Sequence, residues 1–194
     1  MSKITSTDNS ARAKLLSAAH ELFYNYGINS TGIDAIVKRA SVAKKSLYNN
    51  FASKDELVAV YLTERHQEWL DLYHLRARHI LNPQDGVIAV FEAYKDHAEF
   101  AYENGFRGCG LLNAAAELHA GTSGREAVKH HKEDVEAILR NHILAVINDS
   151  DKAKIIARHF SFLLEGSISR AGLEGKSDCI DQACDIAKQI METL

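Results

Sequence analysis

The 194-residue sequence contains very little proline and few cysteines. Pro83 is the single proline, many stretches repeat apolar residues at helical spacing, and runs of β-branched residues are rare. Together these features predict an all-α protein. The three cysteines are an odd number, which argues against a framework of disulfides.

Long apolar segments are also missing. The sequence has no apolar run of about 18 residues, the length needed to cross a membrane as a helix. Its first residues, Met1 to Asp8, lack the apolar stretch of a signal peptide. We therefore expect a cytoplasmic protein with no membrane partner.

Motifs of the common enzyme classes do not occur in this sequence. It contains no Gly-x-Ser-x-Gly motif, no Cys/His cluster with metal-ligand spacing and no phosphate-binding Gly loop. His131 and His142 lie on an apolar stripe, where core histidines are more common than metal ligands. We expect no enzymatic activity, no metal and no cofactor.

The charges are distributed unevenly along the chain. Residues 1–55 hold eight Lys or Arg and four Asp or Glu, a net charge of +4, whereas the remainder holds 15 and 22, a net charge of −7. The total of −3 hides this difference. A basic N-terminal part on an acidic body is typical of a DNA-binding protein.

Residues 41–57 carry the most informative pattern. Leu47 and Phe51 are four residues apart, so they share one face of a short helix and can be buried together. The opposite face is polar and locally basic, and it consists of Lys44, Lys45, Ser46, Tyr48, Asn49 and Asn50. Ser53-x-x-Glu56 then predicts the capped start of the next helix.

A second short helix is expected just upstream of this pattern. Thr31-x-x-Asp34 resembles a capping box, and it opens a helix over 32–40 with Ile33, Ile36 and Val37 on one side. Only three residues, 41–43, remain to connect the two helices. This spacing predicts a helix-turn-helix.

The residues Thr31-Gly-Ile-x-x-Ile36 and Ala40-Ser-Val-Ala-Lys-Lys-Ser-Leu47-Tyr48-x-Asn-Phe51-x-Ser-Lys54-Asp-x-Leu57 resemble the TetR family of bacterial transcriptional regulators. The resemblance covers roughly residues 10–60 in register. It implies a three-helix DNA-binding head over 1–55, with 1–9 disordered, and a helical ligand-binding and dimerisation body over 56–194. About nine helices are expected in all. The usual function in this family is a repressor that binds a palindromic operator as a homodimer and is released by a small molecule.

Carried over residue by residue, the resemblance gives candidate contacts to double-stranded DNA. Tyr48 and Lys54 match family positions that contact phosphates, and Thr31 is a further candidate at a helix start. Bases or phosphates are the expected partners of the remaining candidates, which are Lys44, Lys45, Ser46, Asn49 and Asn50. Three positions depart from the family pattern. Ser41 stands where a left-handed glycine is usual, Lys45 where Gly or Pro is common, and Gly32 where Ser or Thr is usual.

Apolar periodicity predicts the remaining helices. The first runs from about Ser10 to Tyr26, and a long helix starting at Ser53 continues to about Leu81, so head and body share it. Further helices are expected over 84–103, 109–119, 123–148, 151–173 and 178–193. The helix over 151–173 is apolar on two faces, which indicates two partners.

The body is expected to hold the effector and the dimer contacts. Candidate ligand residues are Trp69, Tyr73, Phe91, Tyr94, His97, Cys109, Asn113, Glu117, His131, Phe160 and Phe162. The last two helices are candidates for a four-helix bundle between two copies of the chain. Its candidate interface residues are Phe162, Gly166, Ser169, Ala183, Ala187 and Ile190.

Cys109 supports an alternative function. It follows Gly108 at a helix start and is close to Arg107, an environment that lowers the pKa of a thiol. A redox- or electrophile-sensing regulator is therefore the alternative, and a small buried packing residue is the simpler interpretation. Two further alternatives have less support: an enzyme that uses Cys109 with His119 or Glu117, and an adaptor whose head binds protein.

Overall fold

The computed structural model describes residues 10–194, and every regular element in this range is a helix, as the sequence predicts. Residues 1–9, which we expected to be disordered, lie outside the described residues. The helices are α1 (Ala11–Tyr26), α2 (Ile33–Ala40), α3 (Lys44–Asn50), α4 (Lys54–Ala77), α5 (Pro83–Ala98), α6 (Gly110–Glu117), α7 (Ser123–Ile147), α8 (Ser150–Glu174) and α9 (Asp178–Met191). Over this range, no helix combines the length and the hydropathy needed to span a membrane.

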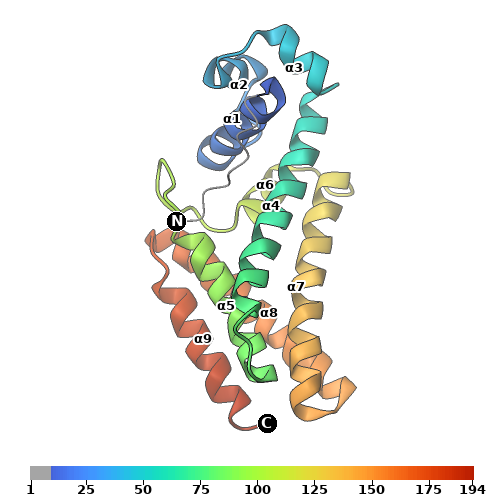
Figure 1. The fold of residues 1–194 in the computed structure, drawn as a ribbon, viewed down its shortest axis with the longest axis vertical. Coiled ribbons are helices and arrows are strands. Elements are labelled where there is room, and N and C mark those ends of the chain that lie inside the picture. Colours follow the sequence, from blue (N-terminus) through green and yellow to red (C-terminus); the bar gives the residue numbers. More distant parts are fainter. Residues whose placement is uncertain (1–9) are drawn as a thin grey trace.

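Helices α1, α2 and α3 form a head at one end of the molecule (Figure 1). Helix α1 packs against both α2 and α3, and the residues that hold the three together are fully buried: Leu15, Ala19, Ile36, Leu47 and Phe51. Ser10 caps α1 by accepting a hydrogen bond from the Ala13 N–H. Gly27 ends it with φ 92°, a conformation that glycine adopts without strain.

The turn between α2 and α3 has the predicted left-handed residue. Ser41 has φ 54° and ψ 43°, and its N–H donates to the Lys38 carbonyl while the Val42 N–H donates to the Val37 carbonyl. These two bonds satisfy carbonyls at the end of α2 that lack helical partners. A turn that usually contains glycine is therefore formed here by serine.

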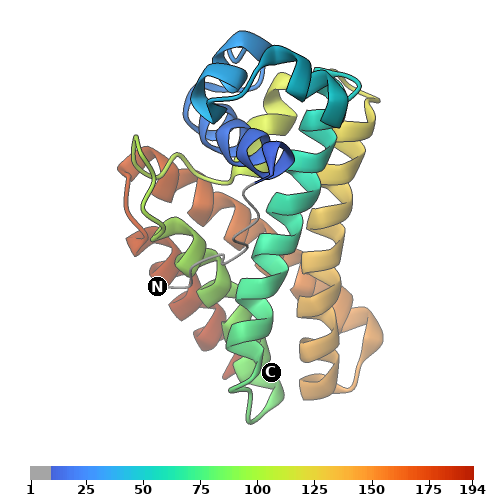
Figure 2. The ribbon, with the colours of Figure 1, turned by 45° about the horizontal axis from the view of Figure 1, so that its top comes forward.

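Helix α4 begins beside the head and runs along the whole body (Figures 1 and 2). Ser53 caps it as predicted, since its side chain accepts from the Glu56 N–H, but the Glu56 carboxylate bonds the Ala52 N–H rather than that of Ser53. The helix ends at Ala77, about one turn before the predicted Leu81. The Asp85 carboxylate accepts from the N–H groups of Leu81 and Asn82, so residue 81 belongs to the connection that caps α5.

Helices α5 to α9 complete the body. Helix α5 packs against α4, α7 and α9, and α8 packs against α7 and α9. Helix α5 ends at Ala98, five residues before the predicted end. Residues 99–109 form a connection that passes beneath the head to α6 (Figure 1). The short helix α6 contacts α1, α4 and α7, which places it between the head and the body.

Candidate nucleic-acid interface and ligand-binding region

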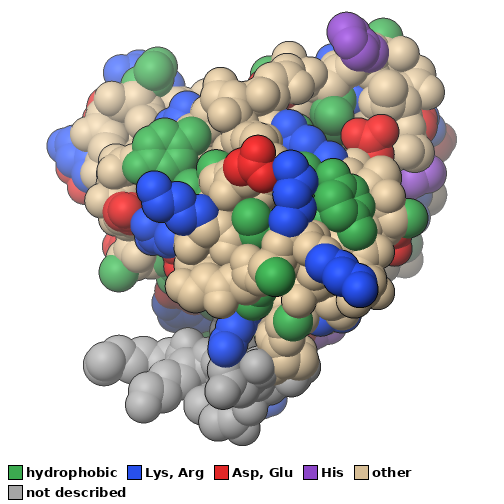
Figure 3. All heavy atoms as spheres, turned by 90° about the horizontal axis from the view of Figure 1, so that it is seen from above, with side chains coloured by type: hydrophobic (Ala, Val, Ile, Leu, Met, Phe, Trp, Pro, Cys, Tyr) green, Lys and Arg blue, Asp and Glu red, His purple; other side chains and the backbone are tan. Residues whose placement is uncertain are grey.

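Helix α3 is fixed by one buried face and presents the other to solvent. Leu47 is fully buried, whereas Tyr48 is 52% exposed, and Lys44, Lys45 and Asn49 are exposed as well. Seen from the head end, Lys and Arg side chains are spread over this surface (Figure 3). A short helix with exposed cationic, aromatic and amide groups can contact both phosphates and base edges.

Two of the predicted DNA contacts on α3 have side chains that bond to partners within the protein. Lys44 Nζ lies 2.8 Å from Asp34 Oδ1 in the first turn of α2, and this hydrogen bond raises the pKa of Lys44. The Asn50 side chain donates to the Ser46 carbonyl at 2.7 Å, along the same helix. Lys44 is therefore positioned by α2, and Asn50 is less free than Asn49 to contact DNA.

The structure places Thr31 differently from the sequence prediction. Its side chain is 2% exposed, and its hydroxyl donates to the carbonyls of Gly27 at 2.7 Å and Leu22 at 3.3 Å. Gly32, not Thr31, is the residue at the N-cap of α2. The buried hydroxyl holds the turn before α2 together and does not reach the surface, so the expectation of a side-chain phosphate contact is corrected.

Lys54 is half-buried beside the same turn. Its ammonium group donates to the Ile28 carbonyl at 2.5 Å. Because an ammonium group has three N–H donors, this bond leaves donors for a phosphate. The predicted phosphate contact of Lys54 therefore stays a prediction.

In the body, the predicted aromatic ligand residues are packed against one another. The Trp69 ring stacks on Tyr73 with centroids 5.8 Å apart, and it also contacts Tyr94 at 5.2 Å and His131 at 5.5 Å. Phe91 and Phe160 form a second pair, with centroids 6.3 Å apart. The Trp69 Nε1–H is buried and has no hydrogen-bond acceptor among the described residues.

A partly buried charged group that the sequence prediction missed adjoins these rings. Lys132 Nζ lies 2.8 Å from Glu165 Oε1, 3.3 Å from the Tyr94 hydroxyl and 3.6 Å from Cys109 Sγ. Burial alone would lower the pKa of Lys132, but Cys109, Tyr94 and Glu165 more than offset it and raise that pKa. Helix spacing could have indicated this burial, because Lys132 follows Val128 by four residues and so lies on the same face of α7.

Two buried histidines of this region, His131 and His97, have lowered pKa values. His131 is buried with Nε2 3.2 Å from the Tyr94 hydroxyl and Nδ1 2.9 Å from His66 Nδ1, and its burial lowers its pKa to about 2. His97 is in contact with the Arg65 guanidinium, which pairs with Glu68 at 2.7 Å. Burial and the Arg65 charge hold the pKa of His97 well below its usual value.

Asn113 and Glu117 do not line the interior of the body, in contrast to the prediction. The Asn113 side chain donates to the Arg107 carbonyl at 3.0 Å. The Glu117 carboxylate accepts hydrogen bonds from the head, from the N–H of Ile28 at 3.0 Å and of Asn29 at 2.7 Å. Both side chains bond to main-chain groups outside the aromatic cluster.

The predicted dimer residues divide between two environments. Phe162 is 65% exposed on α8, and Gly166 and Ser169 are exposed on the same helix, together with Ile155 at 69%. By contrast, Ala183 and Ala187 on α9 are buried in the protein's own core, and Ile190 is partly buried. The alanines are therefore corrected to core residues, which leaves α8 with the exposed apolar face.

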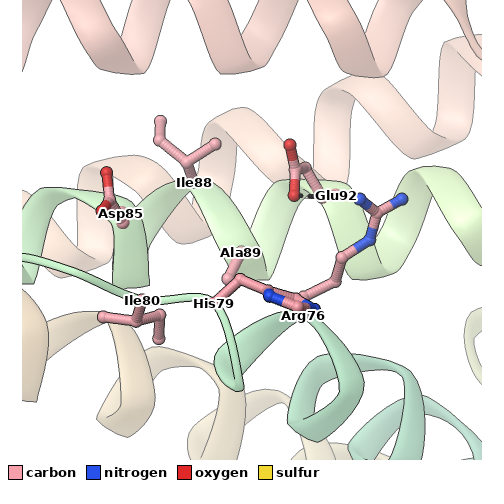
Figure 4. A pocket seen from close by; sticks show the side chains of 7 residues that line it. All are labelled: Arg76, His79, Ile80, Asp85, Ile88, Ala89 and Glu92. Carbon is pink, nitrogen blue, oxygen red and sulfur yellow. Dashed lines mark hydrogen bonds and ion pairs between the residues drawn. The ribbon is translucent and has the colours of Figure 1, made fainter.

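The hollows on the surface of the described body include the following two. One, of about 290 Å³, lies between the end of α4 and the start of α5 and is lined by Arg76, His79, Ile80, Asp85, Ile88, Ala89 and Glu92 (Figure 4). Arg76 is already paired there, with Glu92 at 3.3 Å and Asp96 at 2.6 Å. The other, of about 570 Å³, is lined by Asp151, Lys154, Ile155 and Arg158 on α8. Neither contains a predicted ligand residue.

In comparisons with known proteins, the family match lies in the head. The family model described as bacterial regulatory proteins, tetR family, matches residues 15–61, which span α1 to the first two turns of α4. The transcriptional repressor KstR2 of Mycobacterium tuberculosis is 32% identical over 105 residues, half of each chain. The chain spans about half the length of such curated relatives, all of which are named as transcriptional regulators.

Similarity to solved structures extends over nearly the whole chain. The structure of SCO4454, a TetR-family transcriptional regulator from Streptomyces coelicolor, is 26% identical with a TM-score of 0.86, covering 94% of this chain and 95% of that one. Escherichia coli NemR in its reduced form is 21% identical with a TM-score of 0.73, covering 93% and 97%. The second likeness is one of fold.

Proposed function

Because this chain belongs to the TetR family of bacterial regulatory proteins, we propose that it is a ligand-responsive repressor that binds a palindromic operator as a homodimer. Its relatives are transcriptional regulators rather than enzymes. The observation that carries the proposal is α3, a helix held by buried Leu47 with its polar face open to solvent. As a regulator of chromosomal genes it acts in the cytoplasm.

On DNA, α3 enters the major groove from its N-terminal end. Lys44 and Lys45 are at that end, where side chains reach base edges or phosphates, and Tyr48 and Asn49 lie one turn further along. Lys54 contacts a phosphate beside the groove. The exposed Lys45 adds a cation at a position where the family commonly has Gly or Pro, so the operator of a relative cannot be assumed for this chain.

Two copies pair through the exposed apolar face of α8. Ile155, Phe162 and Ser169 are seven residues apart along that helix, and all three are exposed, with Gly166 between them. This spacing forms one stripe, and a two-fold axis places the stripe against its own copy. The pairing sets the distance between the two α3 helices, which must be about 34–36 Å to reach successive major grooves.

The effector binds among Trp69, Tyr94, His131 and Phe160. A flat, largely apolar molecule with a hydrogen-bond acceptor fits these residues, since the rings can stack on it and the unpaired Trp69 N–H can donate to it. Trp69 contacts Tyr94 and His131 here, so the effector favours a conformation in which these rings are separated. If that conformation spaces the α3 helices differently, effector and DNA each weaken the binding of the other.

A selection on genomic DNA tests the proposal. The protein is incubated with sheared chromosomal fragments in physiological salt, and the retained fragments are sequenced. The expected result is enrichment of a palindrome with half-sites one helical turn apart, lost when Tyr48→Ala is used in place of the wild type. Enrichment equal to that of Tyr48→Ala would contradict the proposal.

A second candidate function is thiol-based sensing through Cys109. Its Sγ lies 3.6 Å from the Lys132 ammonium group and can accept a hydrogen bond from it, and a fold relative has been solved in a form named as reduced. Iodoacetamide at low dose, followed by mass spectrometry, tests it. Cys184 is an internal control, because burial raises the pKa of its thiol to about 11. Labelling of Cys109 no faster than that of Cys184 would end this hypothesis.

A further inference from the structure

The turn between α1 and α2, residues 27–31, is held by a side chain of the body. Both oxygens of the Glu117 carboxylate accept main-chain hydrogen bonds there, Oε1 from Ile28 at 3.0 Å and Oε2 from Asn29 at 2.7 Å. The Asn29 side chain returns a bond to the Glu117 carbonyl at 3.2 Å. At Gly27 a Cβ atom would lie 2.6 Å from Glu117 Oε1, so glycine allows the carboxylate to approach.

The segment just before α6 holds the end of α1. Arg107 Nη1 donates to the carbonyls of Tyr24 at 2.7 Å and Asn25 at 2.6 Å, in the last turn of that helix. These carbonyls lack helical partners, and the end of a helix dipole favours a cation. The Tyr24 hydroxyl completes the contact, since it accepts from the Arg107 N–H at 2.7 Å and donates to the Gly108 carbonyl at 3.2 Å.

The same turn is bonded from α4 and leads directly into α2. Lys54 donates to the Ile28 carbonyl, and the Thr31 hydroxyl closes the turn on Gly27. Because only residue 32 separates this turn from α2, its position sets where α2 and α3 stand relative to the body. Groups from α4 and α6 therefore meet at this short turn, and the segment before α6 holds the end of α1 that precedes it.

We propose that Glu117 and Arg107 are positioning residues that fix the orientation of the DNA-binding head, Glu117 from the end of α6 and Arg107 from the segment before it. The proposal rests on the proposed DNA binding, and it adds a direct connection between α6 and the head to the connection that α4 already provides. Helix α6 begins next to Cys109, whose Sγ contacts Lys132 inside the body, and ends at Glu117. One helix of eight residues thus links the buried polar group to the head.

Charge and orientation predict opposite effects for Glu117→Ala. Removing a carboxylate near the DNA-binding end reduces repulsion of phosphates, so charge alone predicts tighter binding to DNA. Loss of the two main-chain hydrogen bonds lets the head sample other orientations, and DNA must then select one of them. Our proposal predicts weaker binding, with the dissociation constant raised about fivefold or more.

Glu126→Ala is the matched control. Glu126 lies on α7 and is paired with Lys129 at 3.5 Å, so its removal takes away the same charge without a head contact. Fluorescence anisotropy on a selected operator fragment gives the dissociation constants of the wild type and both variants. We also expect Glu117→Ala to keep the salt dependence of the wild type, since it removes no phosphate contact. A dissociation constant for Glu117→Ala at or below that of Glu126→Ala would overturn the proposal.

Amide hydrogen exchange provides a readout that does not require DNA. In Glu117→Ala the amides of Ile28 and Asn29 should exchange at least tenfold faster, while those of α1 and α3 keep their protection. Glu117→Gln, which retains one acceptor oxygen, should recover part of the protection. Wild-type exchange rates at Ile28 and Asn29 in Glu117→Ala would contradict the proposed role of Glu117 directly. Failure of the wild type to select any operator would instead contradict the proposed function.

Discussion

Ser41 adopts a backbone conformation that glycine adopts more easily, with φ 54°. For a residue with a Cβ atom this left-handed conformation costs about 1 kcal/mol or more. A glycine at this position would avoid that cost, but it would lose more conformational entropy on folding, which offsets part of the gain in stability. We expect Ser41→Gly to raise the free energy of unfolding by about 0.5–1 kcal/mol. Ser46→Gly, the same change inside α3, should lower it, and chemical denaturation measures both. A Ser41→Gly variant less stable than wild type would contradict this account of the turn.

The buried histidines make stability depend on pH. The pKa of His131 is about 2 in the folded protein, and that of an unfolded histidine is about 6.5. Below pH 6.5 the unfolded chain therefore binds a proton that the folded protein does not, so the free energy of unfolding falls as the pH falls. Each such histidine contributes a slope of about 1.4 kcal/mol per pH unit between roughly pH 5 and 6.

Replacing His131 should reduce that slope. We expect His131→Gln to lower the proton uptake on unfolding by about one between pH 5 and 6. His130→Gln is the control, because His130 is exposed and pairs with Glu133 on the surface. Denaturant titrations at several pH values measure the uptake. An unchanged slope in His131→Gln would show that His131 is protonated in the folded protein.

Individual residues could be placed from sequence only where their environment follows helix periodicity. Tyr48 and Leu47 were assigned correctly to opposite faces of α3 because neighbouring helix positions point in different directions. Glu117 was misplaced because its partner, Asn29, is 88 residues away in the chain. Thr31 was misplaced because either a capping side chain or a buried hydroxyl is consistent with its local sequence.

At the scale of the element, α8 has two apolar faces, one toward the core and one toward solvent. Phe160 and Ser167 face the core, whereas Ile155, Phe162 and Ser169 face solvent, as the two-sided pattern predicted. Helix α9 was harder to interpret from sequence. Small residues such as Ala183 and Ala187 suit a helix contact within one chain as well as between chains, and the structure places them in the core.

The exposed face of α8 leads to a prediction about assembly. We expect Phe162→Asp to raise the dimer dissociation constant about tenfold or more, since it places a charge where an aromatic side chain is buried between copies. Leu81→Asp is the control, because Leu81 is 92% exposed on the connection between α4 and α5. Analytical ultracentrifugation measures both variants. A monomeric wild type, or a Phe162→Asp variant with the same dimer dissociation constant as the wild type, would contradict pairing through α8.

At the scale of the whole molecule, the fold was predictable and the effector site was not. Apolar periodicity and the TetR-like motif predicted an all-helical chain in which α4 joins head and body. Periodicity does not show whether the interior of the body is a packed core or a ligand site, because aromatic residues such as Trp69 and Tyr94 suit both equally well. Lys132 and Glu165 escaped notice because charged residues on a helix are usually solvated.

The difference in charge between the basic head and the acidic body is also a property of the whole molecule. Because binding of a basic head to DNA depends on salt, a salt titration directly tests the central claim that α3 binds DNA. We would measure the dissociation constant for a selected genomic fragment by fluorescence anisotropy across a range of salt concentrations. The variants are Lys44→Ala and, as a control that removes the same charge, Lys152→Ala, since Lys152 lies at the start of α8 in the body.

We predict tight, salt-sensitive binding by the wild type and Lys152→Ala. For Lys44→Ala we predict weaker binding and a shallower salt dependence, because removing one phosphate contact reduces the slope by about 0.9. If Lys44→Ala and Lys152→Ala bind alike, or the wild type binds the fragment no better than random DNA, α3 is not the recognition helix.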